Sequence, residues 1–227
     1  MFMKLKDIKK ELHKKLYKKL KNDIKKLRPA QEKAVKAGLL KRKNMLVCTP
    51  TASGKTLIAE IAAMQGIYND MGKTVYIVPL KALASEKFNT FRKKYPDINV
   101  GISIGDIDSS EKGLGKNDFI IATSEKLDSL LRHRVSWVRD ISTVVIDEIH
   151  LMNDAHRGPT LEILITMLKS ILQNAQFIGL SATIGNPHEL SEWLDAELVI
   201  DDWRPVELRQ GIFSNGKVKF IDYSNFR

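Results

Sequence analysis

The sequence predicts an α/β protein, a three-layer α/β/α domain with a mostly parallel central sheet, preceded by a lysine-rich helical segment. Three observations support this fold class. Short apolar runs alternate with helix-like segments along most of the chain, which is typical of right-handed βαβ units. The runs are apolar throughout, as expected of strands covered on both faces. Gly, Ser, Thr, Asp and Glu gather at the ends of three runs, where parallel sheets bind ligands.

The first 28 residues carry most of the charge. They hold twelve Lys and Arg against three acidic residues, which gives +9 of the chain's net charge of +10. Their apolar residues recur every three or four positions and share one helical face, and Pro29 ends the pattern. We expect an amphipathic helix or helix pair docked on the domain, with a solvated lysine face; the alternative is that the lysines also meet phosphates. The apolar stripe consists of Leu5, Ile8, Leu12, Leu16, Leu20, Ile24 and Leu27.

From residue 29 to residue 205 strands and helices alternate in a single predicted domain. The runs expected to be strands are residues 44–48, 74–78, 100–104, 119–122, 143–146 and 177–180. The helices expected between them are residues 31–40, 55–67, 82–95, 125–131, 160–172 and 187–194. Residues 206–227 are more polar, and Asn215-Gly216 predicts a hairpin turn there. We interpret this last segment as the start of a connection to a further domain.

Composition narrows the class of protein. Apolar residues make up 43% of the chain and charged residues 28%, which fits a globular protein with a buried core. Cys48 is the only cysteine, so no intrachain disulfide can form, and a reducing, cytoplasmic compartment is expected. The longest apolar stretches fall far short of the ~20 residues of a membrane span, and we expect no membrane partner.

Residues 49–56 are the strongest local signal. They end in SGKT, follow an apolar run and open an apolar helix, which is the context of a phosphate-binding loop. Loop N–H groups and the helix start both favour an anion there, so we expect Lys55 to reach the β- and γ-phosphates and Thr56 to bind Mg²⁺. The usual pattern begins with Gly, where this chain has Thr. The loop expected to enclose the phosphates consists of Thr49, Pro50, Thr51, Ala52, Ser53 and Gly54.

A pair of carboxylates follows the apolar run 143–146. Asp147 and Glu148 come directly after this run and precede Ile149 and His150, so they are expected at the carboxyl edge of the sheet. We expect Asp147 to hold Mg²⁺ and Glu148 to orient and deprotonate an attacking water. Alone such a pair is a weak signal, but a phosphate-binding loop upstream makes it a strong one.

Two hydroxyls, Ser181 and Thr183, follow the run 177–180. On their chemistry alone, the favoured interpretation is that they cap the next helix.

Residues 49–56, 147–150 and 181–183 resemble, in this order, motifs I, II and III of superfamily 2 helicases. DEIH together with TASGKT is similar to the Ski-type branch rather than to the DEAD-box branch. The resemblance covers nearly the whole chain, from about residue 31 to residue 206. It implies a RecA-like motor domain with ATP and Mg²⁺ as cofactors.

Other segments resemble further motifs of this branch. Residues 27–31 resemble its Q motif, which implies that Gln31 recognises adenine. Residues 78–84 and 123–126 resemble motifs Ia and Ib, which contact the nucleic-acid backbone in the family. The contacts implied for this chain are Pro79, Leu80, Lys81, Thr123, Ser124 and Lys126.

The resemblance also gives the third motif a role in coupling. It implies that His150 links the γ-phosphate region to Ser181 and Thr183, so that the state of the nucleotide affects the nucleic-acid groove. A histidine packed after a strand is the alternative.

Residues 181–194 and 202–205 are most similar to the archaeal DNA repair helicases of the Ski type (the Hjm group). This likeness implies single-stranded or branched DNA as partner and 3′-to-5′ movement. Motors of this superfamily close the ATP site with a second RecA-like domain that carries an arginine finger. Because residues 206–227 do not contain it, we expect residues 1–227 alone to bind ATP, hydrolyse it poorly and not unwind a duplex.

Two other classes of function remain open on sequence. One is an ATP-dependent RNA helicase or nucleic-acid remodelling module, because the contacts to 2′-hydroxyls that separate RNA from DNA are not visible in the sequence. The other is a stand-alone nucleotide-binding regulator.

Overall fold

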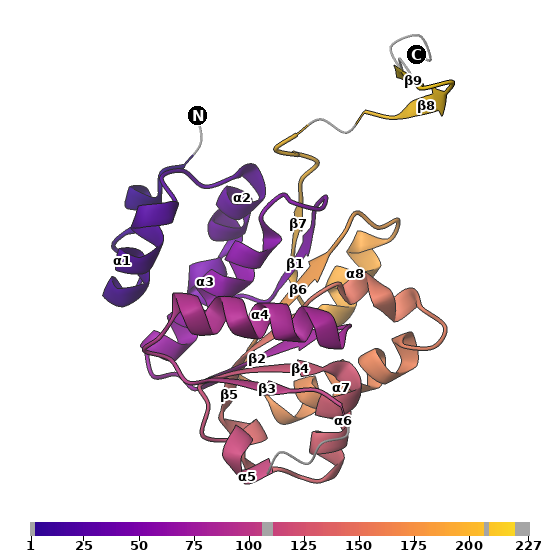
Figure 1. Ribbon diagram of the computed structural model, residues 1–227. Coiled ribbons are helices and arrows are strands. Elements are labelled where there is room, and N and C mark those ends of the chain that lie inside the picture. Colours follow the sequence, from indigo (N-terminus) through magenta and orange to yellow (C-terminus); the bar gives the residue numbers. More distant parts are fainter. Residues whose placement is uncertain (1–2, 106–110, 207–208, 221–227) are drawn as a thin grey trace.

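A seven-stranded sheet forms the centre of the protein (Figure 1). The computed structural model describes residues 3–105, 111–206 and 209–220. The strands lie in the order β3-β4-β2-β5-β6-β1-β7 and all neighbours are parallel, so the predicted α/β fold is confirmed. The strands are β1 (Met45–Cys48), β2 (Lys73–Val78), β3 (Val100–Ser103), β4 (Phe119–Thr123), β5 (Ile141–Ile146), β6 (Gln176–Ser181) and β7 (Glu197–Ile200).

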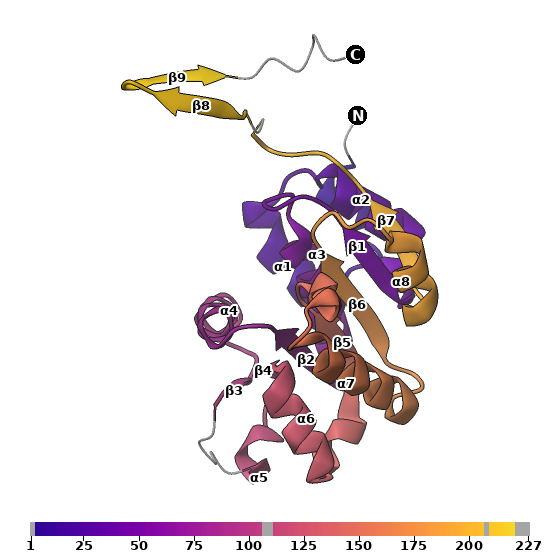
Figure 2. The ribbon, with the colours of Figure 1, turned by 90° about the vertical axis from the view of Figure 1, so that its right-hand side faces the viewer.

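Helices cover both faces of this sheet (Figure 2). The α-helices are α1 (Lys14–Asp23), α2 (Pro29–Ala37), α3 (Lys55–Tyr68), α4 (Lys81–Lys94), α5 (Glu111–Leu114), α6 (Ser124–Arg132), α7 (Gly158–Ile171) and α8 (Pro187–Leu194). Short 3₁₀ helices are η1 (Leu5–Ile8), η2 (Leu39–Lys41), η3 (Ser136–Asp140) and η4 (Ile149–Asn153).

Each face of the sheet has its own apolar core. Successive residues of a strand point to opposite faces, so Met45 and Val47 of β1 join one cluster and Leu46 and Cys48 join the other. The first cluster contains buried residues of α1, α2, α3 and α4. The second contains those of α6, α7 and α8. The continuous apolar runs of the sequence reflect this coverage on both sides.

The carboxyl ends of the strands lie along one edge of the sheet, because the strands run in the same direction. β6 lies between β5 and β1. In register, Ser181 pairs with Cys48 of β1, and Gly179 pairs with Ile146 of β5. The segments that follow β1, β5 and β6 therefore meet at this edge, where open α/β sheets bind ligands.

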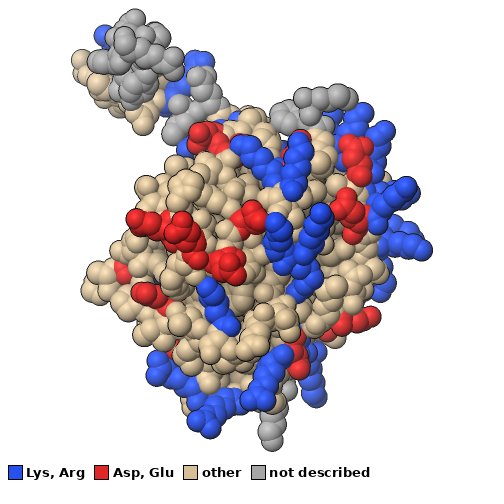
Figure 3. All heavy atoms as spheres, turned by 180° about the vertical axis from the view of Figure 1, so that it is seen from behind, with Lys and Arg blue, Asp and Glu red and all other residues tan. Residues whose placement is uncertain are grey.

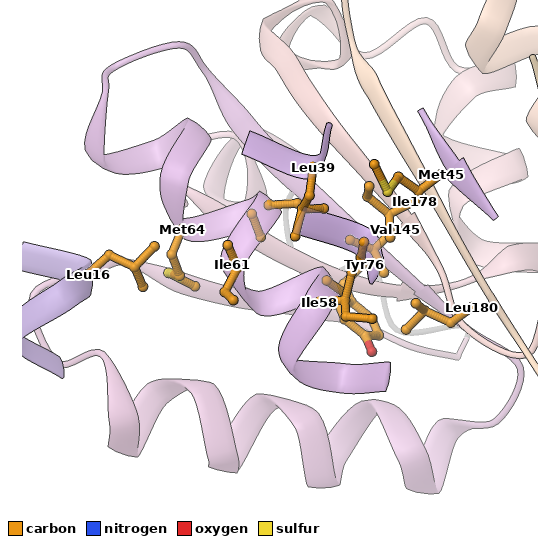
Figure 4. Packing of buried hydrophobic residues seen from close by; sticks show 14 of the residues in the cluster. Leu16, Leu39, Met45, Ile58, Ile61, Met64, Tyr76, Val145, Ile178 and Leu180 are labelled. Carbon is orange, nitrogen blue, oxygen red and sulfur yellow. The ribbon is translucent and has the colours of Figure 1, made fainter. Parts of the chain in front are cut away.

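The N-terminal segment is folded as a helix pair and not as one helix. The 3₁₀ helix η1 and the helix α1 are separated by residues 9–13. Six of the seven apolar residues of the stripe are buried, and the seventh packs against the same core cluster. Leu16 of α1 points toward Met64 of α3 (Figure 4). The segment thus extends the core on one face of the sheet.

The distribution of charge follows the sequence. Lys and Arg gather along the right-hand side of the molecule when it is seen from behind (Figure 3), the side on which the N-terminal helices lie. Exposed lysines of this segment include Lys6, Lys9, Lys10, Lys14, Lys15 and Lys18.

Several elements lie outside the predicted ones. The edge strand β7 and the helices α5, η3 and η4 were not expected from the sequence. Strands β8 (Gly211–Ser214) and β9 (Lys217–Phe220) pair antiparallel around Asn215-Gly216, where the sequence predicts a turn. Residues 207–208 and 221–227 of the predicted connection lie outside the described residues. Within the described ranges, no helix has both the length and the apolar character needed to cross a membrane.

Candidate phosphate-binding site

The segment between β1 and α3 forms a loop at the carboxyl edge of the sheet. Ala52 and Gly54 adopt positive φ angles of 65° and 97°, and glycine takes such a backbone conformation without the steric cost that other residues meet. Pro50 is buried, whereas Thr51 and Ala52 are exposed. α3 begins directly after Gly54. The unpaired N–H groups of its first turn therefore face the loop, which favours an anion.

The inner part of the loop is fixed by its own hydrogen bonds. The Thr49 and Ser53 hydroxyls lie 2.7 Å apart and are buried. The N–H of Thr49 donates to the carbonyl oxygen of Ser181 over 3.2 Å, which continues the pairing of β1 with β6 into the loop. The hydroxyl of Thr49, in the position where the usual pattern has Gly, is thus paired within the loop.

Lys55 lies at the centre of the site. Its ammonium donates to the carbonyl oxygens of Thr49 (3.2 Å) and Ser181 (2.8 Å). Burial lowers the pKa of this ammonium, whereas the carboxylates of Glu148 and Asp147 act in the opposite direction. The loop after β1 and the end of β6 thus meet at one cation, whose charge the two carboxylates favour.

Two side chains hold the outer part of the loop from α2 and its N-cap. Arg28 donates from Nη1 to the carbonyl oxygen of Ala52 over 2.6 Å, and its guanidinium lies 5.5 Å from the ring centre of Trp203. Gln31 is only 4% exposed and donates from Nε2 to the carbonyl oxygen of Gly54 over 3.1 Å. The segment that resembles the Q motif therefore contacts the loop directly.

The two carboxylates after β5 have different surroundings. Asp147 accepts a 2.9 Å hydrogen bond from the Tyr76 hydroxyl and a 3.1 Å bond from the N–H of Glu148. Burial and the Asp147 carboxylate raise the pKa of Tyr76, which keeps its hydroxyl protonated as a donor. Glu148 has a positive φ of 52°, and its side chain is 37% exposed. Asp147 is thus a fixed, partly buried acceptor, and Glu148 is accessible to water.

A second lysine approaches these oxygens from α4. The Lys87 ammonium lies 3.3 Å from the Thr56 hydroxyl, 3.8 Å from Asp147 Oδ2 and 5.7 Å from the ring centre of Tyr76. The two residues that the sequence assigns to a metal therefore already share one cation.

His150 connects the carboxylates with the segment after β6. Its Nδ1 lies 3.3 Å from Glu148 Oε2 and 3.5 Å from the N–H of Ala182. The first contact requires a proton on Nδ1 and the second requires a lone pair there, so the tautomer of the ring decides which of the two forms. Ser181 is the buried last residue of β6, and Thr183 is exposed. The interpretation of these hydroxyls as helix caps is wrong, because α8 begins six residues after Ser181 with Asn186 as its N-cap.

A groove of about 430 Å³ lies beside this site, at the ends of β2 and β4. Five of the six residues expected to contact nucleic acid line this groove, and the sixth, Ser124, is buried and does not. Arg157 donates from Nη1 to the carbonyl oxygen of Pro79 over 3.5 Å, so two residues that line the groove contact each other. The lining residues are Pro79, Leu80, Lys81, Gly105, Thr123, Glu125, Lys126, Ser129 and Arg157.

Sequence motifs did not identify Lys87 and Tyr76 as parts of the site. A signal for Lys87 was present, since it shares a helical face with Ala84 and Phe91, which are fully buried or nearly so, and a charged residue on a buried stripe needs a partner. Tyr76 in the middle of an apolar strand carried no such signal.

Comparison with known proteins gives three findings. The family model described as DEAD/DEAH box helicase matches residues 28–190. Two proteins called ATP-dependent DNA helicase Hel308, from Methanococcus vannielii and Pyrococcus abyssi, are 56% and 55% identical over 88% of the chain. The chain spans 27% and 28% of their lengths. The crystal structure of the DUF1998 helicase MrfA bound to DNA is similar, with a TM-score of 0.75 and 29% identity over 85% of this chain and 30% of that one.

Proposed function

The chain belongs to the DEAD/DEAH box helicase family, and we propose that it is the ATP-binding motor domain of an ATP-dependent DNA helicase acting in DNA repair. One observation carries the proposal: the Lys55 ammonium donates both to the loop after β1 and to the end of β6, and the carboxylates after β5 favour its charge. The name of the relatives supports DNA as the substrate of the longer protein.

The phosphate loop supplies the contacts for a triphosphate. N–H groups of residues 51–56 and the start of α3 stabilise the negative charge of the phosphates. When a nucleotide binds, the Lys55 ammonium gives up a contact with a carbonyl oxygen and donates to phosphate oxygens instead. Gln31 recognises adenine. Its Nε2 uses one N–H for the Gly54 carbonyl oxygen, and its Oε1 accepts one bond from the N–H of Arg28. One donor and one acceptor position of the side-chain amide remain for the base.

The oxygens of Thr56 and Asp147 fit Mg²⁺. Both lie near one cation, the Lys87 ammonium, which supports a shared position for positive charge between the two oxygens. No cluster of three or more His, Cys, Asp or Glu side chains suited to a metal exists in the described part of the chain. Mg²⁺ usually takes one or two protein oxygens and fills its other positions with phosphates and water, so Thr56 and Asp147 suffice to hold it. When bound, the ion neutralises charge on the phosphates.

Glu148 is the general base for hydrolysis. Its carboxylate is accessible to solvent and accepts a proton from a water that attacks the γ-phosphate. His150 senses the event, because its Nδ1 faces both Glu148 and the N–H of Ala182. A change at Glu148 thus reaches Ser181 and Thr183 through one side chain.

The groove beside β2 and β4 takes the nucleic-acid backbone. Lys81, Lys126 and Arg157 supply positive charge at its walls, and phosphate contacts fix the register of a bound strand without reading its sequence. We extend the proposal to single-stranded or branched DNA and to 3′-to-5′ movement, which the longer protein performs with a second RecA-like domain.

Binding of oligonucleotides tests the groove. Fluorescence anisotropy is measured with single-stranded DNA and RNA of one sequence over a range of salt concentrations. Lys81→Ala and Lys126→Ala should each reduce the salt slope by about 1 and weaken binding to all sequences alike. Lys116→Ala is the matched control, because Lys116 is exposed and lines a different pocket. Unchanged salt slopes in both groove variants would exclude this groove, and preferential RNA binding would favour an RNA helicase.

A further inference from the structure

Lys87 occupies an unusual position for a lysine. It lies on the face of α4 that packs on the domain, between Ala84 and Phe91, and its side chain is only 15% exposed. Its neighbours on the same helix behave differently: Lys93 is exposed, and Lys94 pairs with Glu60 over 2.6 Å. Lysine is almost never buried without a partner, so the contacts of Lys87 must compensate for the loss of water.

These contacts are the oxygens proposed for the metal. The Lys87 ammonium lies 3.3 Å from the Thr56 hydroxyl and 3.8 Å from Asp147 Oδ2. The Tyr76 ring, 5.7 Å away, adds a cation–π contact. Asp147 is itself 12% exposed, and a carboxylate so far removed from water needs a nearby cation. Lys87 therefore neutralises Asp147 with a charge that belongs to the chain.

We propose that Lys87 is a built-in competitor of Mg²⁺. This inference rests on the proposed function, because it concerns the same nucleotide site. Metal binding to Thr56 and Asp147 requires the ammonium to leave these oxygens, since two cations cannot share them without strong repulsion. The cost of displacing Lys87 lowers the affinity of the site for the metal, and Lys87 maintains a neutral site when the metal has left.

A different role for Lys87 leads to the opposite result. If its ammonium bound the phosphates of the nucleotide, its removal would weaken nucleotide binding even without metal. A competitor of the metal leaves metal-free binding almost unchanged, and its removal strengthens the effect of the metal.

The test compares ADP affinity with Mg²⁺ and with EDTA. Binding of a fluorescent ADP is measured for the wild type, Lys87→Met and Lys87→Arg, with Lys93→Met as the control on an exposed part of α4. In Lys87→Met the ratio of the two affinities should rise by about fivefold or more, the lower end of typical coupling between two sites. Lys87→Arg keeps the charge and should retain the wild-type ratio, as should Lys93→Met. Circular dichroism establishes that each variant is folded, and Lys87→Gln replaces Lys87→Met if the latter is not.

Failure of this inference and failure of the proposed function are distinguishable. If the wild type binds ADP but the ratio in Lys87→Met is unchanged or lower, competition is excluded while nucleotide binding stands. Weaker binding of Lys87→Met in EDTA would assign the lysine to the phosphates and overturn the inference. If the wild type binds no ADP in either buffer, the proposed function fails, and the competition fails with it.

Discussion

The side-chain amide of Gln31 donates a 3.1 Å hydrogen bond from Nε2 to the carbonyl oxygen of Gly54, which joins α2 to the phosphate loop. The same amide accepts a 2.8 Å bond at Oε1 from the N–H of Arg28. The glutamine thus bridges the N-cap of its own helix and the residue that precedes α3. The shape of the loop depends on this contact as well as on the loop's own sequence.

Gly54→Ala should disrupt the loop. Gly54 has a φ of +97°, and an added Cβ would lie 2.4 Å from Gln31 Nε2. Because the new residue is strained and collides with the amide, we expect a loss of ~1–3 kcal/mol in the free energy of unfolding and weaker ADP binding. Urea denaturation and a binding titration measure these effects. Gly185→Ala is the control, since a Cβ there meets nothing within 4 Å; equal behaviour of the two variants would contradict the prediction.

Tyr76→Phe should destabilise the protein through Asp147. The Tyr76 hydroxyl donates to Asp147 Oδ2 over 2.9 Å in a buried setting, and a hydrogen bond to a charged group contributes ~1.5–3 kcal/mol. The free energy of unfolding should fall by that amount in metal-free buffer. Tyr17→Phe is the control, because the Tyr17 hydroxyl has no hydrogen-bond partner among the described residues. It should change the free energy of unfolding by no more than ~0.5 kcal/mol. A loss in Tyr76→Phe no larger than in this control would refute the role of the bond.

Leu16→Ala tests whether the N-terminal segment belongs to the core. Leu16 is fully buried and packs beside α3 (Figure 4). Truncation of such a leucine leaves a cavity and costs ~2–5 kcal/mol. Chemical denaturation should show one transition with that loss, whereas the exposed Lys18→Ala should behave as wild type. A small effect in Leu16→Ala, or a separate early transition, would mean that the segment folds independently of the domain.

Asp97 pairs with Lys19 of the N-terminal segment, and the stability that this contact contributes should depend on pH. Burial alone would raise the pKa of Asp97, but hydrogen bonds from Lys19, from the backbone and from Tyr68 outweigh it and hold this pKa below its usual value. A lowered pKa in the folded protein stabilises it above the unfolded pKa of ~3.9, and this contribution is lost as pH falls through the folded value. Asp97→Asn should therefore lower Tm at neutral pH and converge with wild type in acid. A constant Tm difference at every pH would contradict this, and the exposed Asp70→Asn should follow wild type throughout.

The sequence predicts six of the seven strands of the central sheet, and the strand that it misses, β7, lies at an edge. β1, β2, β4, β5 and β6 are apolar on both faces, so their runs are continuous, whereas the edge strand β7 has one fully buried residue. The break between η1 and α1 has no local signal, because residues 9–13 contain neither Gly nor Pro. Long-range bonds favour the break: Leu27 donates to the carbonyl oxygen of Met3, and His13 donates to Gln65 Oε1. Tertiary contacts override helix propensity here.

The residues of the candidate site divide in a similar way, into those that a local sequence pattern indicates and those whose partners are distant in the chain. Residues 49–56 and Asp147 can be proposed from the sequence alone, because the chemistry of phosphate and metal binding limits which residues can stand after a strand. The buried helical face indicates that Lys87 needs a partner, but the sequence does not identify that partner, since Thr56 and Asp147 lie 31 and 60 positions away in the chain and meet Lys87 only in the folded protein. Sequence patterns indicate local chemistry, and the fold decides which side chains share it.

The most direct test of the account is equilibrium binding of Mg²⁺–ADP to the wild type and to Lys55→Ala. Lys55 holds the centre of the site through carbonyl contacts of 3.2 Å and 2.8 Å. Removal of its charged hydrogen bonds to phosphate should weaken binding by about tenfold or more, since each contributes ~1.5–3 kcal/mol. The exposed Lys41→Ala should bind as the wild type does. Saturable binding to the wild type with a large loss in Lys55→Ala is the predicted result; equal affinity in the two proteins, or no binding to the wild type, would contradict the assignment of residues 49–56 as the phosphate site.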